Sequence, residues 1–343
     1  MKDIKKKTES CGVKRGAFCR AVSLLLCVLL CALLFSCGEK EHREDLTKDT
    51  EPVEATLGGG EPFTVLLGGT DRAGGLCDVL MLLTLSADRE CAYVIQLPRD
   101  TYALYAEGRY RKLNGGHKFL GSMDALRQYL SESLGVEIQR SICLSPDALC
   151  EVVDTLGGVE INVPQDMDYV DPSAGLSIHL KKGKQRLNGK DAEKFLRYRS
   201  GYLRGDLGRM DAQKLFMAAM LKRLREVGAS ELCGLLTVRG METDLKTTDC
   251  LRLFPTVRAL PEDRIFFVTA PGAEARSADG GSYYSLSAEG MEQLLRTVFG
   301  DRAGRFDPKG VFLNGDNPKF SAIYRGTTEP RFFTAAELSQ EEK

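Results

Sequence analysis

Apolar residues from Phe63 onward occur in short runs separated by polar turns, a pattern that predicts strands interleaved with helices. The run FTVLLG at residues 63–68 is typical of a buried strand, and residues 79–85 and 91–97 form two similar runs. We therefore predict an α/β fold in which a central mixed β-sheet is flanked by helices.

The second and third predicted strands are separated only by the turn SADRE at residues 86–90. A connection this short joins antiparallel neighbours in a hairpin. If Leu85 pairs with Cys91, the same register places Asp78 opposite Pro98 and beside Arg99. We therefore expect a carboxylate and an arginine to meet at one end of the sheet.

The middle of the chain is predicted to form helices and strands that support the fold rather than contact a ligand. Residues 119–134 have helical periodicity, Ser145 and Pro146 begin another helix, and Gly157 and Gly158 end it before the strand VEINV. An apolar slot between these helices and the sheet would suit a lipid chain. The apolar residues that we expect in the core are Leu126, Tyr129, Leu130, Leu149, Val152 and Val153.

Residues 1–37 predict a membrane-targeting segment. Several basic residues precede an uncharged stretch at residues 21–36, which is the arrangement of an exported or membrane-anchored protein. The stretch is short for a spanning helix, so a signal anchor and a lipoprotein signal acylated at Cys37 both remain open. In either case the protein stays at the cell membrane, anchored by its N-terminus, with the rest of the chain on the extracellular face.

Residues 38–61 are first charged and then rich in glycine, without apolar periodicity, and predict a flexible linker. We expect one folded domain over residues 62–300 and a C-terminal tail over residues 301–343. The net charge of −1 gives no indication of nucleic-acid binding. Six cysteines lie beyond the targeting segment without zinc-ligand spacing, and both disulfides and free thiols remain open.

The segment LNGKDAEKFLRYRSGYLRGDLGRMDAQKLF, at residues 187–216, is rich in arginine. Arginine presents a rigid fork of donors that matches two phosphate oxygens, so this segment indicates a phosphorylated ligand, with a solvated surface as the alternative. We expect a helix from Asn188 through Phe195 and then extended chain, with Arg197 and Arg199 on one side. A second helix would carry Arg209 and Gln213 four residues apart on one face. The same segment contains Arg204 and Asp206.

Two acidic residues border the glycine-rich loop GGTDRAGGLCD, Asp71 near its start and Asp78 at its end. Neighbouring carboxylates repel each other, and a divalent cation such as Mg²⁺ or Mn²⁺ relieves that repulsion and bridges phosphate oxygens. In the alternative interpretation both acids cap turns. The loop lacks the Gly-Lys-Ser/Thr ending of a Walker phosphate loop.

Several of these segments, taken in order, resemble the LytR-CpsA-Psr family of membrane-anchored enzymes of Gram-positive cell envelopes. The resemblance covers residues 63–220 and extends less distinctively to residues 264–299. The motifs that carry it are LLGGTDR, QLPRDTY, RKLNGG, DTLGGVEINVP, GKQRLNGKDAEKFLRYRS and GDLGRMDAQKLF.

The resemblance implies a LytR-CpsA-Psr-type fold with an apolar lipid-binding cleft. It also implies an enzyme that transfers a phosphate-linked glycopolymer from a polyprenyl pyrophosphate carrier to peptidoglycan. The polymer would be wall teichoic acid, a capsular polysaccharide or a similar chain, and the partners would include membrane lipid. A binding module for lipid-linked precursors and a polyprenyl pyrophosphate hydrolase are the alternatives.

The resemblance also assigns roles to individual residues. Asp71 and Asp78 would hold the metal, and Asp100 and Asp206 would orient the arginines. The residues expected to be catalytic are Asp71, Arg99, Arg197, Arg199, Asp206 and Arg209. One position departs from the family pattern, because Leu76 stands where an arginine is usual two residues before the second acid. The residues expected to bind pyrophosphate are Arg72, Arg99, Arg197, Arg199, Arg209 and Gln213.

Overall fold

The computed structural model describes residues 61–86, 90–106, 109–172, 175–202, 205–278, 280–306, 320–323 and 329–339. The chain divides into two compact units, residues 1–54 and 55–343, and the first lies outside the described residues. The described residues exclude the predicted targeting segment, nearly all of the predicted linker, and Arg204. None of the helices in the described ranges is both long enough and apolar enough to cross a membrane.

A mixed seven-stranded sheet forms the centre of the second unit, in the order β11-β6-β1-β2-β3-β12-β16. β1 runs antiparallel to β2 and parallel to β6, while β3 runs antiparallel to β2 and parallel to β12. This arrangement confirms the predicted central mixed sheet. The strands are β1 (Phe63–Thr70), β2 (Cys77–Ser86), β3 (Cys91–Gln96), β6 (Arg140–Leu144), β11 (Met241–Thr243), β12 (Ile265–Thr269) and β16 (Phe332–Thr334).

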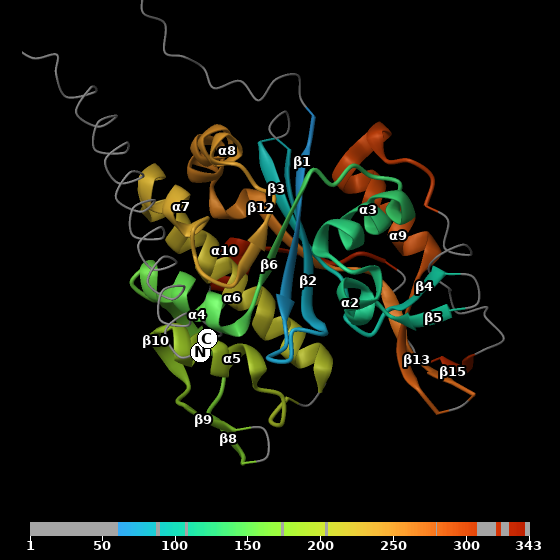
Figure 1. Ribbon diagram of the computed structural model, residues 1–343, viewed down its shortest axis with the longest axis horizontal. Helices are drawn as coiled ribbons and strands as arrows, with labels where there is room; N and C mark the ends of the chain where they lie inside the picture. Colours follow the sequence, from blue (N-terminus) through green and yellow to red (C-terminus); the bar gives the residue numbers. More distant parts are fainter. Residues whose placement is uncertain are drawn as a thin grey trace, which may run out of the picture. The chain divides into compact units, whose positions relative to one another are not determined.

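Helices cover both faces of this sheet (Figure 1). Alternate residues of β2 face opposite cores, since Leu80 and Leu82 pack on one side and Met81 and Leu85 on the other. The first face carries α2 (Gly116–Leu120), α3 (Met123–Leu134) and α9 (Ala288–Phe299). The second carries α6 (Asp206–Glu226), α7 (Ala229–Leu235), α8 (Thr247–Ala259) and α10 (Ala335–Ser339).

A further core cluster joins α4 (Pro146–Thr155) and α5 (Gly189–Arg197) to α6 and to short strand pairs. The remaining strands form small sheets. These strands are β4 (Tyr102–Ala106), β5 (Arg109–Lys112), β7 (Val159–Val163), β8 (Met167–Asp171), β9 (Leu176–Leu180), β10 (Gly183–Leu187), β13 (Gly272–Ser277), β14 (Ser282–Leu286) and β15 (Phe320–Ile323).

The hairpin of β2 and β3 is antiparallel as predicted, but its register differs by one residue. Leu85 pairs with Ala92, because Cys91 pairs with Ser86. The shift brings Arg99, rather than Pro98, level with Asp78 beyond the paired residues. The two side chains consequently meet in a direct ion pair, which is described below.

Of the middle helices, α4 begins where the sequence predicts. Ser145 caps the N-terminus of α4, and Leu126, Leu130 and Val153 are fully buried in the core. The helical segment expected over residues 119–134 is divided at Gly121, whose φ of 94° ends α2 before Ser122 caps α3.

Helix α5 is longer than predicted. Asn188 caps its N-terminus as expected, but the helix continues through Arg197, and Tyr198 is the first extended residue. The expectation that Arg197 and Arg199 extend to one side of a strand-like segment is therefore wrong. Because Arg197 ends a helix, its side chain lies over the preceding turn and reaches Glu193.

Part of the segment predicted as a C-terminal tail joins the fold. β16 pairs with β12 at the edge of the central sheet, and Ala335 of α10 is buried against residues of α6 and β12. The six cysteines in the described ranges are all free thiols.

Candidate anion-binding site

The predicted site residues lie at one end of the central sheet. Asp71 follows β1, Asp78 opens β2 and Arg99 follows β3. Helix α6 begins at Asp206 and presents Arg209 one turn further along. Elements from distant parts of the sequence thus bring acids and arginines together.

Asp206 forms ion pairs with three arginines. Its Oδ1 lies 2.8 Å from Nη2 of Arg209, 3.3 Å from Nη2 of Arg99 and 3.8 Å from Nε of Arg199. Nη1 of Arg99 also donates to Oδ1 of Asp78 over 2.7 Å. We call these five residues the Asp206 cluster, and it carries one more positive than negative charge.

Two buried donors in this cluster have no partner. The Nε atoms of Arg99 and Arg209 are buried and make no hydrogen bond within the described part of the chain. A buried unpaired donor is costly, and an anion that accepts from it removes that cost. The cluster is therefore arranged to receive an acceptor group with several oxygens.

The electrostatic environments of the two buried arginines differ. Burial opposes the charge of Arg99, but Asp206 and Asp78 outweigh it and raise the pKa of Arg99. Burial lowers the pKa of Arg209, although Asp206 opposes this shift. An additional negative charge nearby would therefore stabilise the charged form of Arg209.

Gln213 lies one turn beyond Arg209 on α6 and is buried. Its Oε1 accepts a hydrogen bond of 2.8 Å from Nε2 of Gln96 at the end of β3. Thr269 of β12 donates to Oε1 of Gln96 over 3.4 Å and lies 3.3 Å from Nζ of the buried Lys214. This polar network fixes α6 against the ends of β3 and β12.

Arg72 and Arg197 belong to a second group. Both carboxylate oxygens of Glu193 lie 2.7 Å from Nη2 of Arg72, and Nη1 of Arg197 lies 3.1 Å from Oε1. A further ion pair of 3.6 Å joins Arg72 to Asp147. We call Arg72, Glu193 and Arg197 the Glu193 group, and the hydrogen bond that Arg72 donates to Glu193 raises the pKa of Arg72.

Sequence reasoning did not identify Glu193 as a site residue. Its acidic type near the start of α5 indicated only a favourable helix terminus. The spacing to Arg197 is four residues, which on a helix places the two side chains side by side, and this was the available signal. Its contact with Arg72 joins residues 121 positions apart, and no local pattern predicts it.

The two predicted metal ligands have protein partners. Oδ1 of Asp71 accepts from the backbone N–H groups of Gly75 and Leu76, so Asp71 does organise the turn. Asp100 forms an ion pair of 3.0 Å with Lys112 and adds to the negative field at Arg99.

Among the described residues there is no group of three or more His, Cys, Asp and Glu side chains arranged to hold a metal. The hydrogen bonds described above use Oδ1 of Asp71 and of Asp78, and Oδ2 of each carboxylate is a hard oxygen donor for a cation. Magnesium commonly uses only one or two protein carboxylates and completes its shell with water and phosphate oxygens. The donor set therefore fits such an ion.

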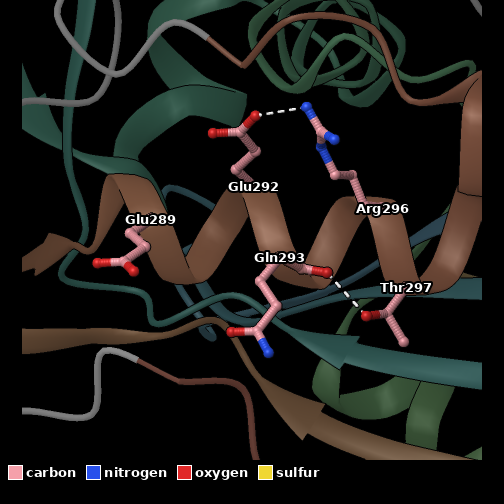
Figure 2. Close-up of a pocket in the computed structure, with 5 residues that line it drawn as sticks. All are labelled: Glu289, Glu292, Gln293, Arg296 and Thr297. Carbon is pink, nitrogen blue, oxygen red and sulfur yellow. Dashed lines mark hydrogen bonds and ion pairs between the residues drawn. The ribbon is translucent and has the colours of Figure 1, made fainter.

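Two surface hollows lie away from these clusters. Figure 2 shows one on the outer face of α9, where Glu292 and Arg296 form a hydrogen bond of 2.8 Å. The other is beside Phe63 at the start of β1, the end of the strand opposite Asp71. Both hollows are lined largely by polar residues, so the apolar lipid-binding cleft stays a prediction.

The fold is that of an α/β protein with a central sheet flanked by helices, and the Asp206 cluster is its candidate anion-binding site. The chain belongs to the LytR_cpsA_psr family, whose model matches residues 33–299. This result confirms the family resemblance drawn from the sequence.

Curated relatives and a solved structure agree with the family assignment. The chain is 32% identical over 262 residues to a polyisoprenyl-teichoic acid–peptidoglycan teichoic acid transferase, TagU of Bacillus mycoides (strain KBAB4), covering 73% of this chain and 83% of TagU. It is 26% identical over 253 residues to the transferase TagV of Bacillus subtilis (strain 168), covering 69% of this chain and 64% of TagV. The crystal structure of B. subtilis TagV matches with a TM-score of 0.62 at 23% identity, covering 70% of this chain and 96% of that one.

Proposed function

We propose that this protein is a transferase that moves a phosphate-linked glycopolymer, such as teichoic acid, from a polyprenyl pyrophosphate carrier to peptidoglycan. The observation that carries the proposal is the convergence of Arg99, Arg199 and Arg209 on Asp206, with buried Nε donors left unpaired. The names of the relatives TagU and TagV support the same reaction class.

The reaction needs stabilisation of negative charge more than it needs proton transfer. A hydroxyl oxygen of peptidoglycan attacks the phosphorus that bears the polymer, the bond to the bridging oxygen breaks, and polyprenyl phosphate leaves. Negative charge develops on the bridging oxygen and on the leaving phosphate. Arg99 and Arg209 can donate to these oxygens from a largely buried position, where the interaction is strong.

Asp206 has a positioning role in this proposal. A carboxylate that forms ion pairs with three guanidinium groups holds them close together despite their mutual repulsion. Arg199 is the most exposed of the three, with a side chain 59% accessible, and is suited to meet the substrate first.

Mg²⁺ or Mn²⁺ would be held by Asp71 and Asp78 and would neutralise phosphate charge when bound. Asp71, whose loop borders the same end of the sheet, would also accept the proton of the attacking hydroxyl. Gln213 would hold a phosphate oxygen through its amide. Leu76, in the family's arginine position, is 41% exposed and contributes no charge.

The polyprenyl chain would occupy apolar space between the sheet and helices α2 and α3, where the largest apolar cluster lies. Such a chain keeps its diphosphate near a membrane surface, and the predicted N-terminal anchor would place the protein there, with the folded domain on the extracellular face. Nucleic acid is not expected among the partners.

The proposal is tested with the purified protein, a purified lipid-linked donor, Mg²⁺ and peptidoglycan. We expect polyprenyl phosphate to be released only when peptidoglycan is present, together with covalent attachment of the polymer. Release without an acceptor would instead identify a hydrolase. Binding of the donor without any release would identify a binding module, and either outcome would contradict the transferase.

A further inference from the structure

Glu193 is a buried carboxylate that holds two of the arginines expected to bind phosphate. Glu193 is only 6% exposed and lies on α5, the helix that ends at Arg197. Both of its oxygens lie 2.7 Å from Nη2 of Arg72, and Oε1 also accepts from Arg197. These contacts occupy donors on both guanidinium groups within the protein.

A carboxylate and a phosphate compete for the same donors. Each presents two oxygens to a guanidinium group at hydrogen-bond distance. While Glu193 holds them, Nη2 of Arg72 and Nη1 of Arg197 are engaged within the protein, and a substrate phosphate must compete for these donors. The Asp206 cluster differs, because Arg99 and Arg209 retain unpaired Nε donors there.

We propose that Glu193 sets the affinity of the site for diphosphates by competing with the bound phosphate for Arg72 and Arg197. The inference rests on the proposed function in taking a diphosphate as the ligand. Glu193 is a positioning residue in this scheme, since it acts through the two arginines.

The competition weakens binding because Glu193 is buried. When Arg72 or Arg197 turns towards a phosphate, the carboxylate loses a neutralising partner inside the protein, and an uncompensated buried charge is unfavourable. Besides the two arginines, Lys190 is a nearby cation, but its Nζ lies 3.9 Å from Oε2 and its side chain is 63% exposed. A phosphate must therefore bind strongly enough to offset this loss, and product release is correspondingly easier.

The test measures the affinity of the purified protein for inorganic pyrophosphate at fixed Mg²⁺ by calorimetry. Glu193→Gln keeps the size of the side chain and removes its charge. We expect this variant to bind pyrophosphate about 5- to 20-fold more tightly than the wild type, because the arginines no longer leave a buried charge unpaired when they turn to the phosphate. In an Arg72→Ala/Arg197→Ala background the same substitution should change affinity less than about twofold, since the contested donors are gone.

Asp191→Asn is the matched control, because Asp191 lies on the same helix and forms its ion pair with Lys194. It removes an equal charge without freeing either arginine and should leave pyrophosphate affinity nearly unchanged. An equal gain in both variants would mean that general electrostatics, not competition, sets the affinity, and would overturn the proposal. Unchanged or weaker binding by a folded Glu193→Gln variant would overturn it as well.

A second measurement does not depend on the stability of any variant. A crystal structure of the wild type with pyrophosphate should show Arg72 or Arg197 bonded to phosphate and withdrawn from Glu193. Bound pyrophosphate with both arginines still on Glu193 would refute the competition while leaving the transferase proposal intact. Failure of both the wild type and Glu193→Gln to bind pyrophosphate would contradict the competition and the proposed function together.

Discussion

Buried polar atoms without a hydrogen-bond partner occur in two different environments near this site. The unpaired Nε atoms of Arg99 and Arg209 lie in a cluster with an excess positive charge, where an anion can use them. The hydroxyl of Tyr202 is also buried without a partner within the described residues, but its ring packs against Tyr198 and the backbone at Gly208. The same kind of atom therefore indicates a ligand in one environment and a packing compromise in the other.

Replacing Tyr202 with phenylalanine should not destabilise the protein. The substitution removes a buried hydroxyl that makes no hydrogen bond, so we expect the free energy of unfolding to stay constant or rise by up to about 1 kcal/mol. Chemical denaturation measures this change. Tyr129→Phe is the matched control and should lose about 1 kcal/mol, because that hydroxyl donates to the carbonyl of Leu104 over 3.0 Å.

A clear loss of stability in Tyr202→Phe would show that its hydroxyl has a bonding partner and would contradict this interpretation.

At the residue scale, the arginines and their spacing could be read from the sequence, but the acids with which they pair could not. Arg209 and Gln213 are buried on one face of α6, as their four-residue spacing predicted. The division of the arginines between Asp206 and Glu193 depends on contacts between distant segments, such as the one from Arg72 to Glu193. Side-chain pairing at that range is set by the packed fold and leaves no periodic signal in the sequence.

Close packing between helices α4 and α5 fixes the position of Arg197 at the end of α5. Gly189, the first residue of α5, lies against the backbone of Cys150 in α4, and an added Cβ would overlap that backbone. Asp154 of α4 also accepts a hydrogen bond of 2.7 Å from the N–H of Gly189. The start of α5, and hence the position of Glu193 and Arg197, is fixed by this contact.

Gly189→Ala should destabilise the protein by about 2–3 kcal/mol, because backbone atoms must separate to admit the methyl group. The measurement is the free energy of unfolding from denaturant titration. Gly234→Ala is the control, since a Cβ there meets no atom within 4 Å, and it should be neutral or stabilising by up to about 1 kcal/mol. Equal stability of the two variants would show that α4 and α5 are not closely packed at this point.

Element boundaries were predictable where a local signal marks them. Asn188, Ser122 and Ser145 cap helices by accepting from backbone N–H groups, and the sequence placed the first and last of these correctly. The C-terminus of α5 was placed two residues early, since no glycine or proline marks it. The one-residue error in the β2–β3 register has a similar origin, because a five-residue turn does not define the register uniquely.

The whole domain extends beyond the region matched by the family. The family model ends at residue 299, whereas β16 adds an edge strand to the central sheet and α10 packs on α6. The ring of Phe333 also lies 5.3 Å from Nζ of the buried Lys214, one residue beyond Gln213. The C-terminal residues therefore support the helix that carries Arg209.

Truncation after residue 328 tests this support. Removal of β16 and α10 exposes apolar surface of β12 and α6, and we expect a loss of about 2–4 kcal/mol in stability. Thermal unfolding of the shortened protein measures it. A chain ending at Ser339 retains both elements and should melt like the full-length protein, while unchanged melting of the shorter chain would show that the tail is dispensable.

At this scale the sequence predicted the mixed sheet flanked by helices but not the contribution of residues 320–339. That segment has short strands and no long periodic run, so its place at the sheet edge depends on tertiary pairing. The lipid-binding cleft, the metal and the membrane anchor stay predictions.

The most direct test of the central claim is the rate of polymer transfer to peptidoglycan by the Arg199→Ala variant, with Arg296→Ala as control. Both side chains are largely exposed, 59% and 74%, so neither substitution should disturb folding, but only Arg199 contacts Asp206. We expect Arg199→Ala to lose about 100-fold or more of the transfer rate at an unchanged melting temperature, because a donor to the developing charge is removed. Arg296→Ala should retain the wild-type rate, and a wild-type rate in Arg199→Ala would contradict the account.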